Sequence, residues 1–198
     1  MPVVVDNQPL STESLGLRTF GQVLAHLQRE NRLVVHVLID GQEPDLSATQ
    51  QLRQTPTEPH TIYVETTEPR TMANEVLDEV LLQVDHADAL RAETVELLRT
   101  EAHGKAFEKL SGCFTCWQAT HESVQKVAQL LRIDMDRLSA DGEPLAALLA
   151  RFSGQLRTIR QAIEDRDFVT LADTLAYELP ESSQRWRSAV EAIRRVLK

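Results

Sequence analysis

The chain has 198 residues, of which 42% are hydrophobic and 26% are charged, so a disordered chain is excluded and two small domains fit the length. Acidic residues outnumber Lys plus Arg by 30 to 21, which gives a net charge of -9. Because this surplus repels phosphate backbones, nucleic acid is disfavoured as a partner.

The N-terminal residues Met1–Asp6 lack the basic region and the long apolar run of a secretory signal peptide. Nowhere does the sequence contain a run of about 18 apolar residues, the length that spans a bilayer. The two cysteines, Cys113 and Cys116, are too few for a disulfide scaffold and suit a reducing compartment. We therefore expect a cytoplasmic protein without a membrane partner.

Short strand patterns and one helix pattern occupy the first third of the chain. Val3–Val5 precedes the turn-forming residues Asp6–Pro9, and Leu10–Leu15 is predicted to be an irregular second strand of a hairpin. From Arg18 to Glu30, apolar residues return at helical spacing, which predicts a helix.

The strongest strand pattern in the chain is Leu33–Ile39, which is rich in β-branched residues and is closed by the turn dipeptide Asp40-Gly41. The polar, proline-containing stretch Gln50–His60 predicts a short strand or a loop. Ile62–Val64 then alternates with polar neighbours and predicts the last strand.

This order of strands and one helix within residues 1–67 resembles the β-grasp fold of ubiquitin and its relatives. Arg32–Asp45 is similar to the middle strands of that fold. The resemblance implies a fold and no activity. Conjugated ubiquitin-like proteins and sulfur carriers need a free C-terminal Gly-Gly, whereas here the last strand continues into Glu65–Arg70, so neither role is implied.

Helical patterns replace the strand patterns after Pro69. Pro69 marks the junction, because proline disfavours the helical conformation at the residue before it. Residues 68–198 are therefore predicted to form an all-α domain after the α+β domain of residues 1–67. Thr71 is the expected N-cap of a long helix that neither Pro nor Gly interrupts before Gly104.

The clearest helical pattern covers residues 103–131. Two rows with a spacing of seven residues lie on one helix face, the geometry of a helical core. The rows are His103, Leu110, Trp117, Val124 and Leu131, and Phe107, Phe114, His121 and Ala128. They predict one long helix, or two helices joined near Gly112, before the polar stretch Asp134–Gly142.

Three further helices are predicted toward the C-terminus. One begins near Pro144, a second is capped by Asp167 and stopped by Pro180, and a third ends the chain. Four or five amphipathic helices with short connections predict an antiparallel bundle. Within it, Asp167–Leu179 resembles a segment of uncharacterised bacterial proteins, a resemblance that implies no activity.

Cys113 and Cys116 form the one motif with reactive potential, a CxxC pair that suits redox chemistry or half of a zinc site. His121 is the nearest additional ligand, since His103 lies about 15 Å from Cys113 along a continuous helix. A redox pair of the thioredoxin type would need a helix to begin near Gly112. The alternative is that Cys113 belongs to the apolar face and packs in the core.

The sequence contains no motif for nucleophilic catalysis, phosphate binding or dinucleotide binding. His36 alternates with valines, so it is expected on a sheet face, and acidic pairs such as Asp173 and Glu178 are expected on solvated helix faces. An enzyme is therefore disfavoured, and no cofactor is expected.

The leading functional hypothesis is a non-catalytic interaction or adaptor protein, similar in architecture to small acidic chaperone bundles. It would bind a protein partner through a sheet surface, a sheet edge or a helical groove. The alternative is a metal or redox protein using Cys113, Cys116 and His121.

Four apolar residues of the C-terminal helix are the candidates for binding a partner or a second copy of the chain. An arginine cluster (Arg185, Arg187, Arg194 and Arg195) surrounds them. This pattern leaves two interpretations open. Either the stripe closes its own core, or the helix is shared with a partner helix or in a homodimer. The candidates are Trp186, Val190, Ile193 and Leu197.

Overall fold

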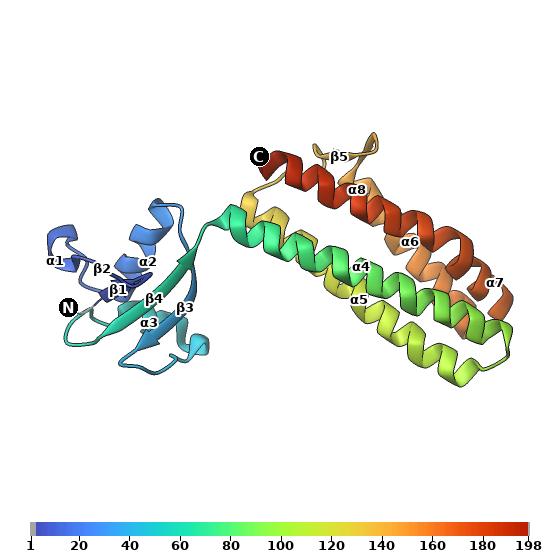
Figure 1. The fold of residues 1–198 in the computed structure, drawn as a ribbon, viewed down its shortest axis with the longest axis horizontal. Helices are drawn as coiled ribbons and strands as arrows, with labels where there is room; N and C mark the ends of the chain where they lie inside the picture. The colour runs from blue at the N-terminus through green and yellow to red at the C-terminus, as the bar shows by residue number, and fades with distance from the viewer. Residues whose placement is uncertain (1–2, 198) are drawn as a thin grey trace. The chain divides into compact units, whose positions relative to one another are not determined.

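The computed structural model describes residues 3–197, and the chain divides into two compact units between Met72 and Ala73 (Figure 1). Unit 1 precedes the division and is α+β, and unit 2 follows it and is mostly helical. Helix α4 begins at Pro69, just ahead of the division. The prediction that each unit folds by itself, with a boundary between residues 67 and 68, stays a prediction.

Unit 1 is built around one mixed sheet. Its strands lie in the order β2-β1-β4-β3, with β1 parallel to β4 and the other neighbours antiparallel. The elements are β1 (Val3–Val5), β2 (Gln8–Pro9), α1 (Thr12–Leu15), α2 (Phe20–Arg29), β3 (Leu33–Ile39), the 3₁₀ turn η1 (Leu46–Ala48), α3 (Thr49–Gln54) and β4 (Ile62–Thr67).

Helix α2 covers one face of this sheet. Thr19 caps the helix by accepting a hydrogen bond from the Gln22 N–H, and the Gln22 side chain bonds back to the Thr19 N–H, a complete capping box. The apolar stripe of α2 packs on the inward residues of β1 and β4. The buried core comprises Phe20, Val23, Leu27, Val3, Ile62 and Val64.

Most of the elements predicted for unit 1 are confirmed, including the α2 helix and the β3 strand. The predicted strand over Leu10–Leu15 is wrong, because residues 12–15 form the short helix α1, which ends at Gly16 with a left-handed φ of 67°. The Gln50–His60 stretch is not simply a short strand or a loop either, since α3 occupies its first residues.

Unit 2 consists of long helices around one hydrophobic core. Its core side chains come from every long helix and include Leu110, Trp117 and Trp186, all of them buried. The elements are α4 (Pro69–Arg99), α5 (His103–Leu131), β5 (Ser139–Ala140), β6 (Glu143–Pro144), α6 (Leu145–Glu164), α7 (Phe168–Asp173), the π-helix η2 (Thr174–Glu178) and α8 (Leu179–Leu197).

The structure corrects one predicted boundary in unit 2, decides between two alternatives for a second, and confirms a third. Helix α4 begins at Pro69, which suits a first helical turn, so Thr71 is not its N-cap. Helix α5 continues through Gly112 without a break. The predicted cap at Asp167 is confirmed, since its side chain accepts a hydrogen bond from the Thr170 N–H at 2.9 Å.

Pro180 does not end the helix that precedes it. Proline lacks an N–H, so in the π-helical register it leaves the carbonyl five residues earlier, that of Leu175, without a backbone donor. Arg91 on α4 supplies the donor instead, because its Nη1 lies 2.9 Å from the Leu175 oxygen. The helical path therefore continues from η2 into α8.

Within residues 3–197, no helix combines the length and the apolar character needed to cross a lipid bilayer. The charged residues spread along the helices account for this result, since even α4, the longest helix, carries Asp, Glu and Arg side chains from its first turn to its last.

We predict that residues 69–198, produced alone, fold cooperatively, because the buried core of unit 2 lies entirely after residue 72. Thermal unfolding followed by circular dichroism should give one sigmoidal helix transition. A helical signal that decays without a cooperative transition would show that unit 2 needs unit 1.

Candidate functional site

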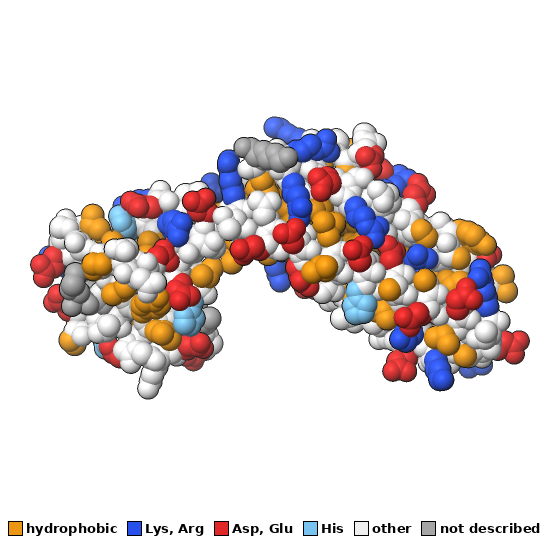
Figure 2. Space-filling model, viewed as in Figure 1, with side chains coloured by type: hydrophobic (Ala, Val, Ile, Leu, Met, Phe, Trp, Pro, Cys, Tyr) orange, Lys and Arg blue, Asp and Glu red, His pale blue; other side chains and the backbone are white. Residues whose placement is uncertain are grey.

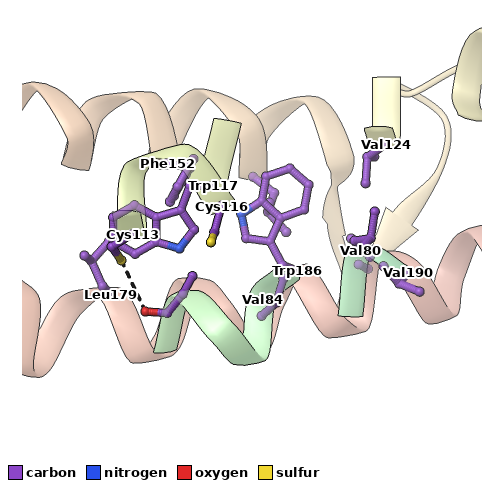
Figure 3. Packing of buried hydrophobic residues seen from close by; sticks show 14 of the residues in the cluster. Val80, Val84, Cys113, Cys116, Trp117, Val124, Phe152, Leu179, Trp186 and Val190 are labelled. Atoms are coloured by element: carbon purple, nitrogen blue, oxygen red, sulfur yellow. Dashed lines mark hydrogen bonds between the residues drawn. The ribbon is translucent and has the colours of Figure 1, made fainter. Parts of the chain in front are cut away.

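The two cysteines lie in the middle of the continuous helix α5. Both are free thiols, and Cys113 is fully buried while Cys116 is 7% exposed. The Cys113 Sγ donates a hydrogen bond to the Ala87 carbonyl on α4 over 3.2 Å, drawn as the dashed line in Figure 3. Because no helix begins at this pair, it lacks the helix N-terminus that activates a thioredoxin-type cysteine.

Burial disfavours the thiolate form of both cysteines. It raises the pKa of Cys113 to about 12, and it also raises the pKa of Cys116. Because these pKa values are raised, both side chains remain thiols at neutral pH. Nucleophilic attack and metal binding need the thiolate instead. The arrangement favours packing over chemistry for this pair.

The histidines near the cysteines contact aromatic rings. His121 meets Trp186 edge to face, with the ring centroids 6.3 Å apart, and His103 stacks on Phe168 with centroids 4.2 Å apart. Among the residues that the structure describes, no group of three His, Cys, Asp or Glu side chains could hold a metal ion. The structure therefore does not assemble Cys113, Cys116 and His121 into a ligand set.

The four partner-binding candidates of the C-terminal helix lie in the core of unit 2. Trp186 is 1% exposed and meets Phe152 edge to face at 5.9 Å, and Figure 3 shows it among the rings of that core. Val190 and Ile193 are fully buried, and Leu197 is 8% exposed. The stripe thus closes its own unit, and a partner could reach it only if α8 came away.

The arginines around this stripe are held by acidic residues of unit 2. Arg187 binds Asp85 at 2.7 Å and Asp88 at 2.8 Å on α4, while Arg194 pairs with Asp78 on the same helix. These pairs neutralise much of the basic cluster and fix α8 against α4. They leave little free positive charge for an anionic partner.

The face of the unit 1 sheet opposite α2 carries an apolar row across all four strands. Tyr63 on β4 is paired with Val4 on β1 and with Leu38 on β3, and Val4 is paired with Pro9 on β2. Residues paired across strands point to the same face. Val4, Leu38 and Tyr63 are each half-buried, and Pro9 is exposed. We call these four residues the apolar row.

None of the row residues belongs to the core beneath α2. Figure 2 shows hydrophobic side chains beside a histidine and acidic side chains on this unit. The row is therefore a partly exposed apolar surface on the face of the sheet away from the α2 core.

Polar side chains border the row. The Tyr63 hydroxyl donates a hydrogen bond to the Asn7 Oδ1 over 2.9 Å, which orients the ring. His36, next along β3, lies 3.3 Å from Glu43 and 4.0 Å from Glu65. The expected position of His36 on a sheet face agrees with its pairing to Glu65. Glu43 and Glu65 therefore form an acidic border along one side of the row, next to β3 and β4.

The outer edge of β3 is less suited to binding than the face. A bulge between Val34 and His36 interrupts its register, and Ile39 is already bridged to Gln42. A hollow of about 220 Å³ beside the edge is lined by Glu43 and Pro44 as well as by β3. Bulges, charges and proline are the features that protect edge strands against pairing with another chain.

Sequence reasoning placed Val4, Leu38 and Tyr63 in strands but did not bring them together. The alternation of Val4 and Tyr63 with core residues is visible in the sequence, because Val3 precedes Val4 and Ile62 and Val64 flank Tyr63. The missing signal was the register, which decides which residues of distant strands become neighbours.

Unit 2 is thus a helical domain with a closed core, and unit 1 is a mixed sheet with one covered face. The chain belongs to the DUF8042 family, described as a domain of unknown function, whose model matches residues 75–189. The match lies within the helical unit and includes Cys113, Cys116 and Trp186. No curated protein and no solved structure matches the chain.

We predict that neither thiol of the folded chain reacts with an aromatic disulfide reagent at pH 8, because burial raises the pKa of both. In denaturant, both should react within minutes. Cys113→Ala with Cys116→Ala should lower the free energy of unfolding by about 1–3 kcal/mol. Rapid native reactivity, or zinc that the double variant loses, would restore the metal or redox hypothesis.

We predict that Trp186→Ala lowers the free energy of unfolding by about 3–5 kcal/mol, because it removes a fully buried indole from the core. Val196→Ala is the matched control on the same helix, since Val196 is 54% exposed, and it should change stability by less than about 0.5 kcal/mol. Urea unfolding measures both. Equal effects would place α8 outside the core.

Proposed function

We propose that the chain is a non-catalytic interaction protein that binds a protein partner through the apolar row of unit 1. The observation that supports this most strongly is the pairing of Val4, Tyr63 and Leu38 into one apolar surface. Contiguous apolar surface that stays partly exposed in a folded protein can mark an interaction site.

The most exposed large apolar side chains of unit 2 lie on four different elements. They are Leu82 on α4, Val169 on α7, Tyr177 on η2 and Val196 on α8. Single exposed apolar residues are ordinary features of a protein surface.

We further propose that unit 1 is a β-grasp domain and that unit 2 is an antiparallel helical bundle. The strand order supports the first assignment, because the last strand, β4, inserts between β1 and β3 and runs parallel to β1. The long helices around one core support the second. In an adaptor of this design, unit 2 would supply a stable body and unit 1 the contact surface.

We predict that Leu38→Glu abolishes capture of a partner from extracts of the native host. A glutamate in the apolar row would have to be desolvated in the complex, so retention should fall at least about tenfold. Leu82→Glu is the control, because Leu82 is 62% exposed on α4. Quantitative mass spectrometry of captured proteins compares the variants.

Circular dichroism first establishes that both variants are folded. A protein retained by the wild type and by Leu82→Glu, but lost with Leu38→Glu, supports the proposal. If the two variants retain the same proteins in the same amounts, the apolar row is not the binding surface.

A further inference from the structure

The spacing of the apolar row matches one helix face. Neighbouring strands lie about 4.8 Å apart, so a row across four strands extends about 14 Å. A helix rises about 5.4 Å per turn, so one apolar side chain per turn over about three turns covers the same length. On the other face of the sheet, α2 already packs in this way with Phe20, Val23 and Leu27.

The border of the row is acidic. Glu43 and Glu65 have side chains that are 78% and 50% exposed, and both lie beside His36. Even a protonated His36 between two carboxylates leaves a net negative charge. Arg32, which precedes β3 in the chain, is bound to Asp6 at 3.0 Å, and residues 1–72 contain no lysine.

We infer that the partner segment bound by the apolar row is an amphipathic helix whose apolar stripe is flanked by Lys or Arg side chains. This inference rests on the proposed function and names its partner chemistry. The stripe covers Val4, Tyr63 and Leu38, and the basic flank meets Glu43 and Glu65. An added strand is the weaker alternative, because the bulge between Val34 and His36 interrupts the register of β3.

Two synthetic peptides test the inference with the full-length chain. Both are about four turns long, are locked as helices by a side-chain staple, and carry the same leucine stripe. One has Lys and the other has Glu at the flanking positions. Titrations followed by amide NMR report both the dissociation constant and the residues that are contacted.

The Lys-flanked peptide should shift the amides of Leu38, Tyr63 and Glu65 and bind about three- to tenfold more tightly than the Glu-flanked peptide. Glu43→Gln with Glu65→Gln should remove that difference. The control pair Glu13→Gln with Glu58→Gln makes the same change of charge beside α1 and should preserve it.

If both peptides bind equally well at the same amides, the inference of a basic flank is wrong, whereas the apolar row is still the binding face. If neither peptide shifts these amides, the helical partner is wrong. The capture assay with Leu38→Glu then decides separately whether the face binds a partner of another kind.

Discussion

Strand β4 is the element on which the arrangement of unit 1 depends. It is the last strand in the chain, yet it lies at the centre of the sheet between β1 and β3. Its register places Ile62 and Val64 in the core and Tyr63 on the opposite face. A shift by one residue would exchange these faces and bury the tyrosine hydroxyl, so the core beneath α2 fixes the apolar row as well.

In unit 2, by contrast, the apolar stripe of α8 packs in the unit's own core. Trp186 fills the core, and Arg187 and Arg194 bind the acidic residues of α4. Such pairs contribute modestly to stability but specify how α8 lies on α4. The Arg91 contact to the Leu175 carbonyl serves a similar purpose, since it satisfies a group that Pro180 leaves without a backbone donor.

Sequence patterns predicted the elements that have a strong periodicity, such as α2, β3 and α5, because burial of one face imposes that periodicity. They failed at Pro180, where a side chain from a distant helix replaced the missing backbone donor. They also left the role of the C-terminal stripe open, since an apolar stripe looks the same whether it faces its own core or a partner. The apolar row required a strand register that no local pattern contains.

A photoreactive benzoylphenylalanine at position 38, introduced into the full-length chain in its native host, tests the central claim most directly. The same residue at position 82 supplies the comparison, because Leu82 is exposed on unit 2. The proposed binding face predicts that illumination at position 38 yields a specific crosslinked protein that position 82 does not yield. A specific crosslink at position 82, with none at position 38, would contradict it.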